Sequence, residues 1–159
     1  MEEFEKFFNQ AIRFLSYRIR SEKEIRDYLH KKQTPIETIE KIVQSLKEHK
    51  FINDEEFARR WIESRTTHHL KSKKIIRLEL FQKGIDKELI EKLLEGDAEM
   101  VVDDIEQARK LIEKKLPHLQ GFPPEEVRQK LGGFLARKGF SWDTIKKSVD
   151  KSLDEVQLD

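Results

Sequence analysis

The sequence predicts an all-α protein of about nine helices, and three observations support this prediction. The 159 residues include only six glycines and four prolines, fewer turn residues than a β-sandwich or a barrel needs. Most of the remainder is Lys, Glu, Leu, Ile, Arg and Gln, which helices favour or tolerate. Apolar residues also recur at helical spacing along the chain, which disordered chains rarely show.

The composition excludes several classes of protein. Charged residues make up 40% of the chain and apolar residues 36%, and no run of about 18 apolar residues occurs, so no transmembrane helix is expected. The acidic segment Met1–Glu5 lacks the features of a signal peptide. The absence of cysteine excludes disulfides and thiolate metal sites. We therefore expect a cytoplasmic protein that does not associate with membranes.

Apolar stripes and start signals predict the first three helices. The first spans about residues 4–17. Ser21 begins the second in a capping box with Glu24. Thr34 begins the third, with Pro35 at its first helical position. The apolar positions of these helices are Phe4, Phe8, Ala11 and Leu15; Ile25 and Leu29; and Ile36, Ile39, Val43 and Leu46.

The next three helices have equally clear boundaries. Asn53 caps the fourth, and Asp86 caps the sixth. The fifth spans about Ser72 to Lys83 and ends at Gly84. Its apolar residues cover more than one face, so it is expected to be well enclosed. The apolar positions are Phe57, Ala58, Trp61 and Ile62; Ile75, Ile76, Leu78, Leu80 and Phe81; and Leu89, Ile90, Leu93 and Leu94.

The last three helices are predicted at about residues 103–116, 125–138 and 142–153, with a loop at 117–124. Gly132 and Gly133 lie inside the eighth helix, where we expect them to allow close helix packing beside Phe134. Trp142 opens the ninth helix and is expected to be partly exposed, whereas Trp61 is expected in the core.

The nine helices form three copies of one unit. Segments 25–39, 76–90 and 131–145 align without gaps. The coinciding residues are Leu29, Leu80 and Leu135; Lys32, Lys83 and Lys138; and Ile39, Ile90 and Ile145. Gly84 and Gly139 match each other, and Gln33 stands at this position in the first copy. We therefore expect three tandem three-helix repeats of about 50 residues in an elongated, curved array.

The expected divisions follow from this alignment. They are a first repeat at 1–52, a second at 53–96, an acidic linker or helix start at 97–106, a third repeat at 107–153 and a C-terminal tail at 154–159. The acidic segment is poor in core residues, so we expect a hinge there.

Charge is segregated although the net charge is only +1. Segment 59–83 holds eight basic and two acidic residues, and segment 86–106 holds nine acidic and two basic ones. Two interpretations remain open: a contact with phosphates or an acidic protein, or a solvated face that keeps the protein soluble. The low net charge does not favour strong DNA binding by the chain alone.

No catalytic or metal-binding motif is found. His68 and His69 are adjacent, and helical neighbours do not share a face, so they make a poor metal site. The chain has no Gly-rich phosphate loop and no serine nucleophile elbow. We therefore expect no enzymatic activity, no cofactor and no metal.

Several segments together resemble the RecX family of bacterial regulatory proteins. They are Arg20–Ile25, Phe51–Ala58, Ile76–Leu80 with Lys83–Ile85, and Phe134–Phe140, and the resemblance spans about residues 11–153. Gln33, Lys50 and Ser72 stand where the family often has glycine.

The resemblance implies a modulator of the RecA recombinase. Family members are three tandem three-helix repeats that lie in the groove of the RecA filament on single-stranded DNA. They inhibit its ATPase and strand exchange, have no catalysis of their own, and in some cases bind DNA weakly. The resemblance places the family's basic helix at Lys73, Lys74, Arg77 and Lys83. We expect a monomer.

Charge adds further residues to the predicted partner- or nucleic-acid-binding set, namely Arg59, Arg60, Arg65, Lys71, Arg137 and Lys138. Two alternatives to RecA binding remain. One is a sequence-independent nucleic-acid-binding module, which would bind naked DNA with a steep salt dependence. The other is a helical-repeat adaptor for another protein.

Overall fold

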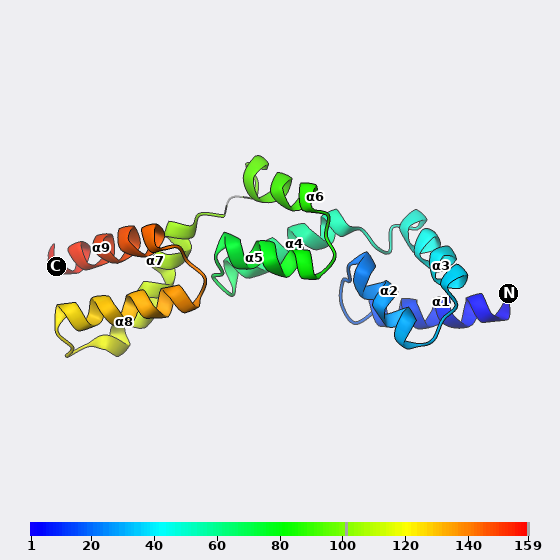
Figure 1. Ribbon diagram of the computed structural model, residues 1–159, viewed down its shortest axis with the longest axis horizontal. Helices are drawn as coiled ribbons and strands as arrows, with labels where there is room; N and C mark the ends of the chain where they lie inside the picture. The colour runs from blue at the N-terminus through cyan, green and yellow to red at the C-terminus, as the bar shows by residue number, and fades with distance from the viewer. Residues whose placement is uncertain (101, 159) are drawn as a thin grey trace. The chain divides into compact units, whose positions relative to one another are not determined.

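The computed structural model describes residues 1–100 and 102–158, and over these residues it contains nine α-helices and no strand (Figure 1). The predicted all-α class is therefore confirmed. The helices are α1 (Glu2–Leu15), α2 (Glu22–Lys31), α3 (Ile36–Glu48), α4 (Asp54–Thr67), α5 (Lys73–Gln82), α6 (Lys87–Glu91), α7 (Asp104–Lys115), α8 (Pro124–Arg137) and α9 (Trp142–Leu158). A π-helical turn (Lys92–Gly96) continues α6, and a 3-10 turn (Leu116–Leu119) continues α7.

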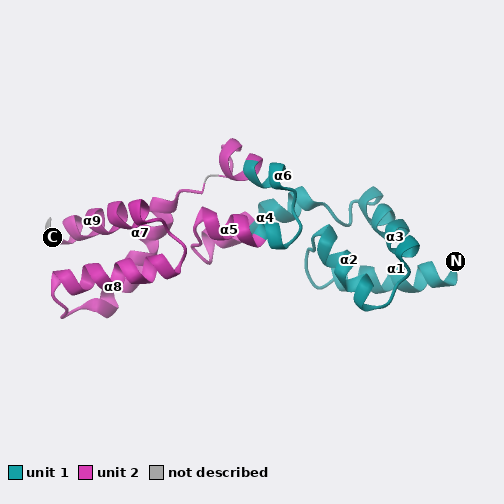
Figure 2. Cartoon of the chain, viewed as in Figure 1, with its two compact units in different colours: residues 1–61, 80–91 teal, residues 62–79, 92–159 magenta. Residues whose placement is uncertain are grey.

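The chain divides into two compact units (Figure 2). One contains residues 1–61 and 80–91, and the other contains residues 62–79 and the chain from residue 92 onward. Because the division falls inside α4 and α5, the expected repeat boundaries stay predictions. The expected linker includes Val101 and the expected tail includes Asp159, and both residues lie outside the described part of the chain.

The C-terminal helix is longer than expected. The sequence predicted an end near Leu153 and a tail from residue 154, but α9 continues to Leu158. The expected tail is therefore largely helical. The helix continues past Leu153 because no glycine or proline follows that residue to end it.

The first three helices enclose one apolar core. Ala11 of α1, Ile25 and Leu29 of α2, and Ile42 and Leu46 of α3 are fully buried there. The predicted start of α3 needs correction. Pro35 is the residue before the helix and not its first helical residue, and Ile36 is 69% exposed. The core side of α3 begins only at Ile39.

Helices α4 and α5 each bury one face. In α4, Phe57, Ala58 and Ile62 are buried, and Trp61 is partly buried with its ring stacked on Phe57 at 5.6 Å between centroids. In α5, the buried residues include Ile76 and Leu80, whose spacing of four places them on one side.

The prediction that α5 is well enclosed was wrong in part. Leu78 is 51% exposed and Phe81 is 64% exposed. Both residues point away from the stripe formed by Ile76 and Leu80, because the α-helix has 3.6 residues per turn. A second apolar stripe in a sequence does not by itself show that a partner covers it.

Helices α7, α8 and α9 surround a separate apolar core, which includes Ala108, Ile112, Leu131, Leu135 and Ile145. The expected close helix packing at the two glycines of α8 is not found among the described residues, because a methyl group on Gly133 would first meet Arg137 Nη1 of the same helix, at 3.3 Å. A methyl group on Gly132 would lie 3.9 Å from Ile145 Cγ2, an ordinary contact distance. Trp142 is 74% exposed, in line with its place at the start of α9.

Candidate partner interface

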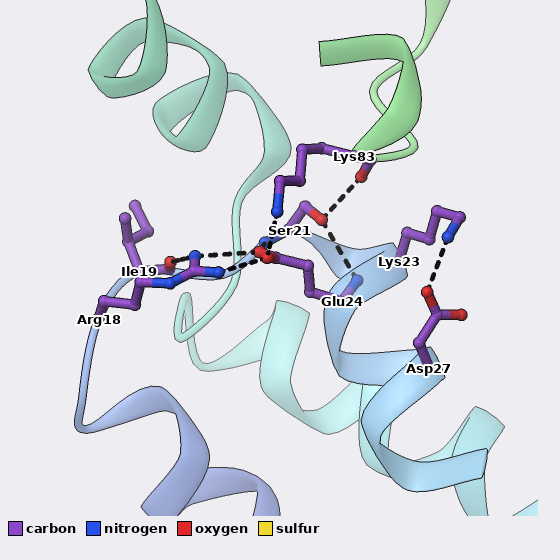
Figure 3. A network of polar contacts seen from close by, with 7 residues as sticks. All are labelled: Arg18, Ile19, Ser21, Lys23, Glu24, Asp27 and Lys83. Carbon is purple, nitrogen blue, oxygen red and sulfur yellow. Dashed lines mark hydrogen bonds and ion pairs between the residues drawn. The ribbon is translucent and has the colours of Figure 1, made fainter. Parts of the chain in front are cut away.

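The first of two similar hydrogen-bonded clusters lies at the N-terminus of α2, and we call it the first junction. The buried Ser21 hydroxyl accepts from the amide of Glu24 (3.2 Å) and donates to the carbonyl oxygen of Lys83 (2.7 Å) (Figure 3). The amide of Glu22 donates to Asp54 Oδ1 (2.8 Å). The start of α2 is thus satisfied partly by residues from α4 and from the end of α5.

Glu24 is the electrostatic centre of the first junction. It accepts hydrogen bonds from Arg18 Nη2 (2.5 Å), the backbone amide of Ser21 (3.0 Å) and Lys83 Nζ (3.0 Å) (Figure 3). Burial alone would raise the pKa of Glu24, but these three donors outweigh it and lower the pKa to about 2. The predicted capping box is confirmed. Lys83, a residue of the second repeat, adds a further hydrogen bond to its glutamate.

The second junction repeats this arrangement at the N-terminus of α5. The buried Ser72 hydroxyl accepts from the amide of Ile75 (3.3 Å) and donates to the carbonyl oxygen of Gly139 (3.2 Å). The amide of Lys73 donates to Asp104 Oδ1 (2.9 Å). The hydroxyl and the next amide therefore have partners of the same kind as in the first junction.

Each junction contains one partly buried aspartate. Burial raises the pKa of Asp54 and of Asp104, and the backbone amide that each carboxylate accepts from opposes this shift. Each aspartate thus accepts a hydrogen bond from a helix N-terminus, although its burial disfavours the charged form.

A glycine closes each junction. Gly84 and Gly139 follow α5 and α8 with positive φ angles of 78° and 91°. A methyl group on Gly84 would lie 2.5 Å from Lys23 Cβ, and one on Gly139 would lie 2.5 Å from Ile75 Cγ1. The close approach at each junction therefore requires glycine, whereas Gln33 holds a φ of 60° at the aligned position of the first repeat.

Six of the ten predicted site residues form ion pairs within the chain. The pairs are Arg59–Glu55 (3.2 Å), Arg60–Glu56 (2.8 Å), Arg65–Glu79 (2.8 Å), Lys73–Glu95 (3.3 Å), Arg77–Glu95 (3.4 Å) and Lys83–Glu24 (3.0 Å). Most of these carboxylates lie outside segment 59–83. Counting charge within that segment therefore overestimated the positive charge that the fold leaves unneutralised.

The other four predicted residues are Lys71, Lys74, Arg137 and Lys138, and they form no ion pair with any residue that the structure describes. Lys71 and Lys74 lie on either side of Ser72, and Arg137 and Lys138 precede Gly139. The hydrogen bond between Ser72 and Gly139 brings these two segments together. We call these four residues the unpaired basic cluster.

One substitution between repeats explains why Lys138 has no carboxylate partner among the residues that the structure describes. Lys83 and Lys138 occupy aligned positions, but the position of Glu24 in the first junction is taken by Ile75 in the second. Lys83 accordingly bonds Glu24, whereas Lys138 Nζ lies 5.7 Å from the centroid of the Phe134 ring. The second junction therefore presents a positive charge that the first neutralises.

No metal site accompanies the cluster in the described part of the chain. No three His, Cys, Asp or Glu side chains come together there in a group able to hold a metal ion. His68 and His69 are exposed at the end of α4. Among the same residues, no helix has both the length and the apolar character needed to cross a membrane.

The comparisons with known proteins agree with this threefold architecture. The sequence models of the first, second and third three-helix domains of RecX match residues 8–46, 53–94 and 102–149. The chain belongs to the RecX family. In RecX terms, the first junction joins the first domain to the second, and the second junction joins the second domain to the third.

Curated RecX proteins are similar over most of this chain. "Regulatory protein RecX" of Bacillus velezensis (strain DSM 23117 / BGSC 10A6 / LMG 26770 / FZB42) is 36% identical over 151 residues, which cover 95% of this chain and 57% of that protein. The RecX protein of Bacillus subtilis (strain 168) is 35% identical, with 94% and 56% covered. The chain thus spans somewhat more than half the length of these relatives.

Solved RecX structures share the fold. The crystal structure of RecX from Lactobacillus salivarius has a TM-score of 0.79 and 28% identity, with 96% of this chain and 97% of that chain covered. A second crystal structure, of a regulatory protein RecX, has a TM-score of 0.74 and 30% identity, with 93% and 72% covered.

The residues that join the RecX domains were not predicted from the sequence. Ser21 and Ser72 stand at the same offset before Ile25 and Ile76, so the repeat alignment contained the information. Asp54 and Asp104 look like ordinary acidic residues at a helix start, and nothing local marks them as acceptors for a distant amide.

Proposed function

We propose that this chain binds the RecA filament on single-stranded DNA and inhibits its ATPase and strand exchange, thereby regulating recombination and DNA repair. The observation that carries this proposal is the match of all three RecX domain models, together with relatives named regulatory protein RecX. We further propose that the chain acts in the cytoplasm, as a monomer, and as a regulator without catalysis of its own.

The unpaired basic cluster is the proposed contact surface. Its four cations form no ion pair with a carboxylate of any described residue. Their charge is therefore available to an acidic patch of RecA or to phosphates of the bound DNA. The six ion-paired cations are less suited to this role, because a new contact would first have to replace an existing ion pair.

The test is the DNA-dependent ATPase of RecA on single-stranded DNA, with the chain added at substoichiometric amounts. We expect a steep loss of ATPase activity with the wild-type chain. The double variant Lys74→Glu/Arg137→Glu should need about tenfold more protein for the same loss. The matched control Lys110→Glu/Lys146→Glu reverses two exposed lysines of α7 and α9 and should inhibit like the wild type.

Two results would contradict the proposal. Absence of inhibition by a wild-type chain that circular dichroism shows to be helical would reject RecA regulation. Full inhibition by a folded Lys74→Glu/Arg137→Glu variant would reject the unpaired basic cluster as the contact surface.

The same cluster favours one alternative, a sequence-independent nucleic-acid-binding module. Such a module would bind naked DNA without RecA, and its affinity would fall steeply with salt because each neutralised phosphate releases counterions. Weak binding with a flat salt response would eliminate it. If neither RecA nor DNA bound, a role as an adaptor for another protein would be favoured.

A further inference from the structure

A hollow around Phe134 is lined by several cations and, among the described residues, by no carboxylate. Its volume is about 310 Å³, and its lining comprises Lys115, Gln129, Lys130, Gly133, Phe134 and Arg137, together with Leu119. All of these residues belong to the third RecX domain. We propose that this hollow, the Phe134 hollow, is a binding site for a phosphate group, an assignment that goes beyond RecA regulation.

Aromatic rings hold the lysines of the hollow without neutralising them. Lys115 Nζ lies 5.2 Å from the centroid of the Phe134 ring. Lys130 Nζ lies 4.7 Å from the centroid of the Phe122 ring. A cation–π contact favours a position for the ammonium group but leaves its full charge and its hydrogen-bond donors for a ligand.

Gly133 brings the arginine into the same place. A methyl group on Gly133 would lie 3.3 Å from Arg137 Nη1, so the guanidinium folds back along α8 over the glycine. Lys115, Lys130 and Arg137 form no ion pair with any residue in the described ranges. Three unneutralised cations from α7 and α8 therefore line one hollow.

This chemistry suits a phosphate group. Guanidinium and ammonium groups donate charge-assisted hydrogen bonds to phosphate oxygens, and arginine does so with two donors at once. The amide of Gln129 adds a neutral donor. The ligand is either the phosphodiester of a single-stranded nucleic acid or a free polyphosphate, because both present the same group.

A second hollow in the first unit shows what distinguishes the Phe134 hollow. It measures about 450 Å³ and is lined by Lys23 and Arg26 but also by Glu22, Asp27 and Asp54. Lys23 pairs with Asp27 (2.7 Å) and Arg26 pairs with Glu22 (3.0 Å). Its cations are thus already satisfied, so volume and basic residues alone do not define an anion site.

The test measures phosphate binding without RecA. Tripolyphosphate is titrated into the full chain by calorimetry, and a fluorescein-labelled oligo-dT is titrated by anisotropy over a range of salt. The hollow variant is Lys115→Gln/Lys130→Gln, which lies outside the unpaired basic cluster. The matched control, Lys110→Gln/Lys146→Gln, removes the same charge from exposed positions on α7 and α9.

We expect the hollow variant to bind at least one ligand about fivefold to tenfold more weakly than both the wild type and the control. For oligo-dT, the slope of log K against log salt should fall by about 0.7 for each lost phosphate contact. Loss for oligo-dT alone would identify a nucleic acid as the source of the phosphate, and loss for tripolyphosphate alone would identify a free polyphosphate.

The proposal is overturned if the wild-type chain binds neither ligand, or if the control loses as much affinity as the hollow variant. In the second case the binding depends on total charge and not on the hollow. Because no RecA is present, either result leaves the proposed regulation of RecA to its own test. Circular dichroism and thermal unfolding of both variants verify that they fold.

Discussion

The two junctions share a backbone arrangement and differ in charge. In each, a buried serine caps a middle helix, an aspartate accepts the next amide and a glycine closes the contact. The first junction adds Glu24, which neutralises Lys83, whereas the second has Ile75 in its place. The same hydrogen bonds can therefore join neighbouring repeats at both junctions. A single side chain, Glu24 or Ile75, then determines whether the aligned lysine is neutralised within the chain or remains available to a partner.

The largest expected effect comes from the glycines that close the junctions. Gly84→Ala and Gly139→Ala should each lower the free energy of unfolding by about 2 to 4 kcal/mol, because both add backbone strain and a steric clash. Gly84→Ala should be the more damaging of the two. It meets Lys23 Cβ, which cannot rotate away, whereas Gly139→Ala meets Cγ1 and Cδ1 of Ile75.

The control for these variants is Gly121→Ala. Gly121 also has a positive φ, of 89°, but a methyl group there would meet no atom of a described residue within 4 Å. This variant should lose only about 1 kcal/mol, the cost of backbone strain alone. Urea unfolding provides the measurement, and equal losses at all three glycines would refute the close approach at the junctions.

An intermediate effect is expected from pH at the first junction. The pKa of Glu24 is lowered to about 2, so its contribution to stability is present above the ordinary pKa of 4.5 and is lost as the pH falls toward 2. Because solvent screens this partly buried group, we expect a loss of about 1 to 2 kcal/mol. The pKa of Asp54 and of Asp104 is raised, so acid acts on these two in the opposite direction.

Comparing the wild type with Glu24→Gln isolates the contribution of Glu24, since both aspartates are present in both proteins. Urea unfolding at neutral pH and at about pH 3 should show a smaller loss of stability on acidification in Glu24→Gln. Glu37→Gln, a change at an exposed glutamate of α3, should retain the full loss. If the wild type and Glu24→Gln lose the same amount of stability on acidification, the ionised Glu24 of the network in Figure 3 contributes nothing to stability.

The smallest expected effect on stability comes from making the second junction resemble the first. Ile75→Glu would supply both a capping box with Ser72 and a carboxylate for Lys138. These gains and the loss of a partly buried apolar side chain should nearly cancel, leaving the free energy of unfolding within about 1 kcal/mol of wild type. The inhibition of the RecA ATPase should nevertheless weaken, because Lys138 would be neutralised.

Ile75→Gln is the matched control, since it removes the same apolar contact without adding charge. It should inhibit RecA more strongly than Ile75→Glu does. If the two variants inhibit equally, the charge of Lys138 has no part in the contact.

Local sequence predicted the helices well because their causes are local. The capping box of Ser21 and Glu24 and the caps at Asn53 and Asp86 act within a few residues, and the structure has each of them. Burial was predicted less well. Periodicity identifies an apolar stripe but not whether another helix covers it, which is why Ile36, predicted on the apolar face of the third helix, is exposed in the structure.

The candidate site depended on contacts that sequence windows do not contain. Lys83 and Glu24 are 59 residues apart, and Lys73 and Glu95 are 22 residues apart, so no count within one segment shows that they neutralise each other. Lys115 and Lys130 were missed for the opposite reason. Acidic residues lie near them in the sequence, although none of these lines the Phe134 hollow.

The hydroxyl bond of the first junction has a consequence for the growing polypeptide. Ser21 donates to the carbonyl of Lys83, so the hydroxyl at the start of α2 cannot form its native hydrogen bond until residue 83 has left the ribosome. The hydrogen bond from Ser72 to the carbonyl of Gly139 likewise forms only after residue 139 has been synthesised. Chains are synthesised from the N-terminus, so the middle helix of one repeat gains its last N-terminal hydrogen bond only after the next repeat has been synthesised. A chain truncated within one repeat therefore lacks this hydrogen bond in the repeat before it.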